Sequence, residues 1–229
     1  MTETLEYAPG RAIDTYGTGS PGKVLIWHGR GPNERNVLAP LATAVADRGV
    51  RVFVPDWDST GSDRGRADLL RSVKFARENG GDDPLVIVGW SLGGTAAASI
   101  ALNARRLGLE FVPVVCLAGA FEATDPISGE PFESIAVPRK GAGYVRLVHG
   151  TKDNITEVGG ARKFAGRLEK SSWNSSLVEL PVDHAGIVGA ELDAGHIRRV
   201  PSQEPAALGA LEVVAGIISE TAFVRSPSA

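Results

Sequence analysis

The chain lacks the features that mark secreted, membrane-spanning and nucleic-acid-binding proteins. Its 229 residues include a single cysteine, Cys116, so no internal disulfide is possible and a reducing compartment is expected. The net charge is −3, which offers no basic field to a nucleic acid. No cationic segment precedes an apolar one at the N-terminus, and no run reaches the roughly 18 apolar residues of a membrane span. We therefore expect a cytoplasmic protein without membrane or nucleic-acid partners.

The chain has instead a regular alternation of short apolar segments and helical patterns. The apolar segments have the length of strands and occupy residues 23–29, 50–56, 85–90, 111–119, 144–150 and 176–181. Helical patterns cover residues 33–49, 66–81, 95–108 and 205–220, and a further helix is expected to begin near Glu157. Such alternation predicts parallel strands joined by helical crossovers.

These elements predict the α/β class, with a doubly wound, mostly parallel sheet that carries helices on both faces. The length of the chain fits one domain over residues 1–229. Because the segment before the first clear strand is short, we expect six or seven strands. The first twenty residues fit either an edge strand or a loose arm.

Residue types that carry out catalysis gather where the predicted strands end. In open sheets of this class the ligand site lies beyond the carboxyl ends of the strands. The sequence places at those ends "HGRG" (28–31), "DWD" (56–58), "GWSLGG" (89–94), "HGTKD" (149–153) and "VDHAG" (182–186). We therefore expect a site at this edge of the sheet.

The segment Gly89-Trp90-Ser91-Leu92-Gly93 matches the G-x-S-x-G pattern of a nucleophile on a sharp strand-to-helix turn. The pattern also arises by chance in a chain rich in glycine and serine, but here it falls between a predicted buried strand and a predicted helix. The N-terminus of that helix adds oriented N–H groups near the serine. We interpret Ser91 as a nucleophile, and the alternative is a serine that caps the helix.

A serine hydroxyl needs a base to become a nucleophile, and the chain offers four histidines. His28 and His149 stand at the ends of predicted strands and are expected to be packed or hydrogen-bonded there. His196 lies in a polar segment that no strand leads to. His184 follows the last strand on a loop that can bring it over the serine, so we predict His184 as the base, the alternative being a surface histidine.

The base needs an acid to orient it, and Asp153 follows a predicted strand shortly before a helix. The order Ser91, Asp153, His184 along the chain matches the order of nucleophile, acid and base in α/β-hydrolases. Asp183 is adjacent to the base and points elsewhere, and Asp125 is the second candidate. The alternative for Asp153 is a charge at the N-terminus of the helix.

Acyl transfer also needs N–H donors directed at the developing oxyanion. One candidate is the backbone N–H of Leu92, directly after the nucleophile. The other comes from "HGRG", where Arg30 N–H is the first choice and Gly31 N–H the second. The Arg30 side chain is expected to be exposed to solvent, with binding of an anionic substrate as the alternative.

These segments resemble the α/β-hydrolase superfamily, and most closely its small bacterial serine esterases and dienelactone-hydrolase-like members. "HGRG" is similar to the HGGG oxyanion motif, with Arg30 in place of a glycine, "HGTKDNIT" to the HGxxD segment of the acid, and "DHAG" to the histidine loop. The nucleophile is a serine, unlike the cysteine of dienelactone hydrolases and the aspartate of haloalkane dehalogenases and epoxide hydrolases. The resemblance therefore implies a serine hydrolase.

Many relatives carry a helical cap before the acid, but the irregular segment Phe121–Gly143 is too short for one. We therefore expect a reduced fold without a cap domain and an open cleft for a small ester. The candidate walls of this cleft are Trp27, Trp57, Trp90, Phe121, Trp173 and Ile187.

The sequence thus predicts a carboxylic-ester hydrolase with a Ser-His-Asp triad, a small-molecule ester as its partner, and neither a metal nor a cofactor. A thioesterase, peptidase or acyltransferase with the same triad stays open. So does a non-catalytic ligand-binding protein on the same fold. The sequence does not decide between a monomer and a homodimer.

Overall fold

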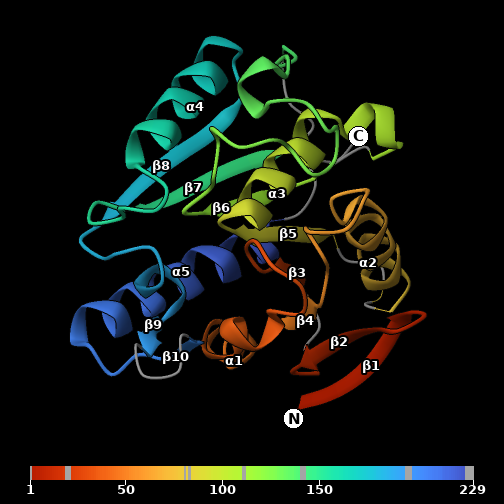
Figure 1. The fold of residues 1–229 in the computed structure, drawn as a ribbon, viewed down its shortest axis with the longest axis vertical. Helices are drawn as coiled ribbons and strands as arrows, with labels where there is room; N and C mark the ends of the chain where they lie inside the picture. Colours follow the sequence, from red (N-terminus) through yellow and green to blue (C-terminus); the bar gives the residue numbers. More distant parts are fainter. Residues whose placement is uncertain are drawn as a thin grey trace.

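The computed structural model describes residues 2–18, 22–79, 81, 84–109, 112–139, 143–193 and 198–224. Within these residues the central sheet has eight strands in the order β1-β2-β4-β3-β5-β6-β7-β8 (Figure 1). The strands are β1 (Thr2–Ala8), β2 (Arg11–Tyr16), β3 (Lys23–Trp27), β4 (Arg51–Pro55), β5 (Leu85–Trp90), β6 (Val114–Leu117), β7 (Tyr144–Gly150) and β8 (Asn174–Leu180). The strands β4, β3, β5, β6, β7 and β8 run parallel to one another. Strand β2 pairs antiparallel with β4, and β1 pairs antiparallel with β2.

The six strands predicted from the sequence are all present, but the expected total of six or seven is wrong. An N-terminal hairpin supplies the two further strands of the described sheet, β1 and β2. The N-terminal segment is therefore an edge strand and not a loose arm. The sequence signal of β1 is weak because the strand is mostly exposed and polar, with Leu5 and Tyr7 partly buried against the core and Ala8 buried.

Helices cover both faces of the sheet, as predicted. They are α1 (Ala39–Ala46), α2 (Arg66–Glu78), α3 (Leu92–Leu102), α4 (Val158–Lys170) and α5 (Pro205–Phe223). The helices α2, α3 and α4 share one hydrophobic core, whereas α1 and α5 share the core on the opposite face (Figure 1). The sheet lies between these two apolar layers, which is why β3 and β5 are buried almost throughout and rich in branched side chains.

Helix α5 is the one described helix that is long and apolar enough, by length and composition alone, to cross a membrane. Half of its apolar window is buried inside the protein. It packs against α1 and β5, and Val214 and Ile218 belong to the core that α1 also lines. In this fold α5 is a core helix.

A short antiparallel pair, β9 (Ala190–Asp193) and β10 (Arg198–Pro201), lies between the loop of His184 and α5. The sequence pattern does not predict this pair. It pairs Arg199 with Leu192, which is exposed. His196 lies outside the described residues.

Candidate active site

Ser91 stands on the sharp turn between β5 and α3, as the G-x-S-x-G pattern predicts. Its backbone has φ of 58° and ψ of −120°, a strained conformation for a residue with a side chain. The turn requires two glycines, because a Cβ on Gly89 would lie 2.0 Å from the Gly93 oxygen and a Cβ on Gly93 would lie 2.4 Å from the His28 oxygen. The Ser91 N–H donates to the Leu117 carbonyl at 2.9 Å, which ties the turn to β6.

Asp153 and His184 come from the ends of β7 and β8 and form a hydrogen bond. The distance from His184 Nδ1 to Asp153 Oδ2 is 2.7 Å, and both side chains are almost fully buried. The turn after β7 holds the carboxylate in place, since the N–H groups of Ile155 and Thr156 both donate to its Oδ1 at 2.9 Å. The Thr156 hydroxyl lies 2.9 Å from Asp153 Oδ2 and 3.1 Å from His184 Nδ1. Four groups therefore fix the orientation of the carboxylate.

The Asp153 carboxyl is held in its charged form. Burial by itself would raise its pKa, but the hydrogen bonds from His149, His184 and the Thr156 N–H outweigh this effect and hold the pKa well below its usual value. His149 lies at the end of β7 with its Nε2 2.7 Å from the Thr156 carbonyl and 3.4 Å from Asp153 Oδ2. A buried carboxylate beside an imidazole can orient the ring and stabilise an imidazolium.

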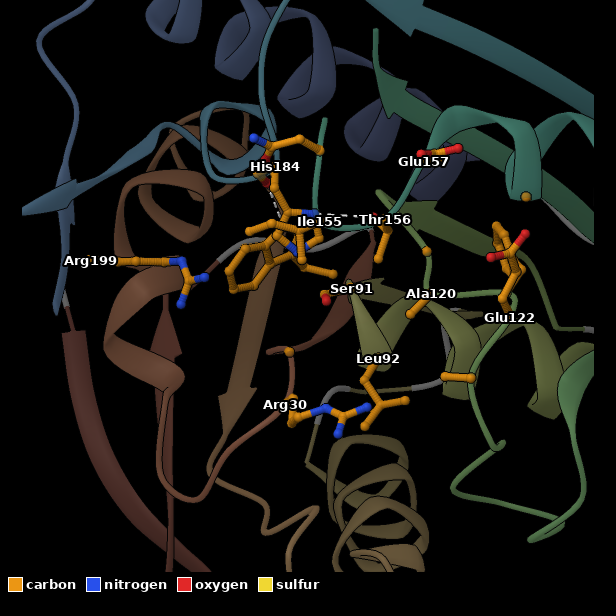
Figure 2. A pocket seen from close by; sticks show the side chains of 17 residues that line it. Arg30, Ser91, Leu92, Ala120, Glu122, Ile155, Thr156, Glu157, His184 and Arg199 are labelled. Carbon is orange, nitrogen blue, oxygen red and sulfur yellow. Dashed lines mark hydrogen bonds between the residues drawn. The ribbon is translucent and has the colours of Figure 1, made fainter. Parts of the chain in front are cut away.

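Ser91 and His184 line the same cavity, whose volume is about 750 Å³. Figure 2 shows Ser91 below the His184 side chain and Thr156 to the right of it, joined to the ring by a dashed line. Among the described residues no hydrogen bond joins the Ser91 hydroxyl to His184. In serine hydrolases such a bond often tightens only when a substrate is bound.

Trp90 also helps to hold His184 in place. Its indole N–H donates to the His184 carbonyl at 2.9 Å, and the centroids of the two rings lie 5.0 Å apart. Because Trp90 directly precedes Ser91, the strand that positions the serine also positions the histidine loop.

The structure distinguishes between the two expected oxyanion donors of "HGRG". Neither the Arg30 N–H nor the Leu92 N–H has a hydrogen-bond partner in the described part of the chain, and both residues line the cavity. The Gly31 N–H instead donates to the Ser59 hydroxyl at 2.9 Å, so the expectation that it faces the oxyanion is wrong. A Cβ on Gly29 would lie 3.1 Å from the Ser91 Cβ, which shows how closely this loop passes the serine.

Two of the expected wall residues, Trp90 and Phe121, line the cavity. The described part of residues 121–143 contains one short 3-10 helix, η3 (Phe132–Ser134), and no α-helix, in agreement with the absence of a helical cap. Other residues at the rim were not predicted: Glu122, Ile155, Thr156, Glu157 and Arg199. Ile155 is 63% exposed, and its place directly after the acid turn is the signal that would have identified it.

The remaining expected wall residues belong to the core, so their assignment to the site is wrong. Trp27, Trp57 and Ile187 are completely buried and do not line the cavity. Trp27 points toward α2, where its indole N–H donates to Ser72, and Trp173 packs with α4 in the same core. Sequence periodicity does not show which side of a strand end faces the site, and each of these side chains lies on the core side.

The other acidic candidates have structural roles. Asp125 is completely buried and accepts hydrogen bonds from the Ser99 hydroxyl and from the Ile127 and Ser128 N–H groups, so it anchors the segment after β6 to α3. Asp183 accepts from the Gly186 N–H. Within the described residues no group of three or more His, Cys, Asp or Glu side chains is arranged to hold a metal ion.

Comparison with known proteins identifies the family. The family model described as "Alpha/beta hydrolase family" matches residues 24–204, which is most of the chain. No sequence among curated proteins matches this chain significantly.

Solved structures with the same fold span nearly the whole chain. A truncated carbohydrate esterase from gut microbiota has a TM-score of 0.70 and 13% identity, covering 98% of this chain and 97% of its own. Thermogutta terrifontis esterase 2 phosphorylated by paraoxon has a TM-score of 0.71 and 17% identity, covering 99% and 96%. A putative dienelactone hydrolase from Klebsiella pneumoniae subsp. pneumoniae MGH 78578 has a TM-score of 0.68 and 17% identity, covering 96% and 98%. At these identities the likeness shows the fold alone, and together with the match over residues 24–204 it means that the chain belongs to the alpha/beta hydrolase family.

Proposed function

We propose that this chain is a serine hydrolase that cleaves small carboxylic esters through an acyl-enzyme. The observation that carries the proposal is the 2.7 Å hydrogen bond between Asp153 and His184, since His184 lines the same cavity as Ser91. A serine on a strained turn, an imidazole and a buried carboxylate are the three groups that acyl transfer by this route requires. The esterases among the structural neighbours support the same class of reaction.

In the first half of the proposed reaction the Ser91 Oγ attacks the ester carbonyl carbon while His184 Nε2 takes the hydroxyl proton. Asp153 accepts the Nδ1–H of the imidazole and stabilises the positive charge that forms on it. The negative charge on the carbonyl oxygen is met by the N–H groups of Leu92 and Arg30. His184 then gives its proton to the leaving alcohol.

In the second half a water molecule attacks the acyl-enzyme. His184 takes a proton from this water, and the collapse of the second tetrahedral intermediate returns the proton to Ser91 Oγ as the acid is released. All proton transfers pass through one imidazole, which is why the contacts of Trp90 and Thr156 with His184 matter for the rate.

The test is the hydrolysis of p-nitrophenyl acetate and butyrate. We expect a burst of one p-nitrophenol per chain, and Ser91→Ala should lower kcat by about 10⁴-fold or more. Ser171→Ala is the matched control, because Ser171 follows α4 and does not line the cavity. Circular dichroism should show that both variants keep the fold. Wild-type turnover by Ser91→Ala would overturn the mechanism.

The same three side chains fit a thioesterase, a peptidase or an acyltransferase. The cavity has an apolar wall, formed by Trp90, Phe121 and Leu92, but this wall does not select the leaving group. Rates on an ester, a thioester and an amide with the same acyl group would separate the three classes, and a preference for the amide would overturn the ester assignment.

A ligand-binding protein without catalysis is the alternative from another class. The N–H groups of Arg30 and Leu92, which have no hydrogen-bond partner among the described residues, argue for an oxyanion site. Stoichiometric modification by a fluorophosphonate would support catalysis, and inertness at high reagent concentration would support passive binding. We further propose that the protein acts in the cytoplasm on a small molecule, as the sequence predicts.

A further inference from the structure

Charges of opposite sign stand on opposite sides of Ser91. Figure 2 shows Arg199 on one side of the serine and Glu122 and Glu157 on the other, and all three line the cavity. Glu122 is paired with Lys163 at 3.3 Å. Arg199 forms no ion pair with a carboxylate in the described part of the chain. Within the described residues Arg199 therefore adds a positive charge to one side of the cavity, and the exposed Arg30, on a different side of Ser91 (Figure 2), adds a second one.

Arg199 is held over a fixed aromatic platform. Its guanidinium carbon lies 5.0 Å from the centroid of the Trp90 ring, within the range of a cation–π contact. The Trp90 ring is itself fixed, because its N–H donates to the His184 carbonyl at 2.9 Å. A stacked guanidinium keeps the N–H donors on its edge free, and these can bind a carboxylate through two parallel hydrogen bonds.

The position of Arg199 relative to His184 indicates which part of an ester it meets. In the proposed mechanism His184 returns its proton to the leaving oxygen, so the leaving alcohol lies on the side of the imidazole. The Trp90 ring lies 5.0 Å from the His184 ring, and the guanidinium lies 5.0 Å from the Trp90 ring. These two successive separations place the guanidinium within about 10 Å of the imidazole. A substituent on the leaving alcohol that passes along Trp90, which lines the same cavity, would reach the guanidinium.

We propose that Arg199 binds a carboxylate carried by the alcohol part of the ester, so that the preferred substrates are acyl esters of hydroxy acids. This inference rests on the proposed function and adds the class of leaving group to it. The carboxylate lies against the side of the cavity that carries Arg199, whereas Glu157, which lies on the other side of Ser91 and has no ion pair among the described residues, disfavours a negative charge there.

Three acetates that differ in the charge of the leaving phenol test the proposal: 4-acetoxybenzoate, its neutral methyl ester, and the cationic 4-acetoxyphenyltrimethylammonium. Arg199→Gln should lower kcat/KM for the anionic ester by about tenfold, the value of one partly exposed charge-assisted hydrogen bond. The neutral ester should change by about twofold or less. Comparing the same ester between two proteins cancels its intrinsic reactivity.

Two further variants serve as controls. Arg105→Gln removes an exposed arginine of the 3-10 helix η2 (Ala104–Leu107), which does not line the cavity, and should leave all three rates unchanged. Arg199→Lys keeps the charge but loses the planar fork, so it should retain part of the preference for the anionic ester. Raising the ionic strength should reduce that preference in the wild type.

Each of the following results would contradict the inference. An equal loss on all three esters would mean that Arg199 only supports the fold around Trp90. Unchanged rates on the anionic ester would mean that it does not meet the leaving group. If the wild type hydrolyses the acetates but shows no preference for the anionic one, the inference fails while the proposed function stands. If none of the three acetates is hydrolysed faster by the wild type than by Ser91→Ala, both fail.

Discussion

The buried histidine at the end of β3 makes the stability of the fold depend on pH. His28 is completely buried, with its Nδ1 2.9 Å from the Gly29 carbonyl and its Nε2 facing the N–H groups of Trp57 at 3.2 Å and Glu34 at 3.4 Å. The neutral ring with the proton on Nδ1 satisfies all three contacts, whereas a second proton on Nε2 would face two donors. Burial lowers the pKa of His28 from 6.5 to about 4.

The size of this pH effect on stability follows from the difference between the pKa of His28 in the folded and in the unfolded chain. The pKa in the folded state lies below that in the unfolded state, so as pH falls the unfolded chain takes up the proton first. The contribution of the neutral His28 to the stability of the fold is complete above pH 6.5 and is lost as pH falls toward 4. The full difference in pKa corresponds to roughly 3 kcal/mol in the free energy of unfolding, of which about 2 kcal/mol is lost between pH 7 and pH 5.

Urea unfolding of the wild type and His28→Gln at pH 7 and pH 5 measures this loss. Glutamine can accept the same N–H groups but does not titrate, so every other titrating group contributes equally to both proteins. The free energy of unfolding of the wild type should fall by about 2 kcal/mol more than that of the variant. The same fall in both proteins would refute the assignment of a buried neutral imidazole to His28.

Three further substitutions test the geometry around the site. Asp153→Asn should lower kcat by about 10³- to 10⁴-fold with the fold intact, because the imidazole loses the acceptor that fixes its tautomer, and a loss below tenfold in steady-state kinetics would contradict this role. Gly93→Ala places a Cβ 2.4 Å from the His28 oxygen and should lower the free energy of unfolding by about 2 kcal/mol or more, so a melting temperature like that of the wild type would contradict the observed turn. Thr156→Val keeps the shape but removes the hydroxyl between Asp153 and His184, and it should cost about 1 kcal/mol of transition-state stabilisation, seen as a fall in kcat with KM unchanged. An unchanged kcat would show that the hydroxyl does not help to position the ring.

The parts of the fold and site that the sequence predicts are those with strong local signals. The turn of Ser91 can be found because Gly89 and Gly93 are sterically required there and because a buried strand and a helix flank it. Asp153 and His184 can be found because both follow parallel strands, whose carboxyl ends meet at one edge of the sheet. The structure places Ser91 and His184 at one cavity, and Asp153 is hydrogen-bonded to His184.

The parts that the sequence does not predict depend on contacts between distant segments. The choice between the Arg30 and Gly31 N–H groups is decided by Ser59, which binds Gly31. The wrong assignment of Trp57 arises because its side chain stacks on His28 in the core, a contact that composition does not reveal. Arg199 reaches the cavity only through the pairing of β9 with β10, two short strands without a clear pattern.

The most direct test of the account is the site of covalent modification by paraoxon. The proposed mechanism requires the Ser91 hydroxyl to be activated by His184, and an activated serine attacks the phosphorus of this reagent and releases p-nitrophenol. Mass spectrometry of the intact protein and of its peptides should show one diethylphosphoryl group per chain, located on Ser91, and no adduct in Ser91→Ala. Modification of another residue, or none at saturating reagent, would contradict the claim that Ser91 is the nucleophile.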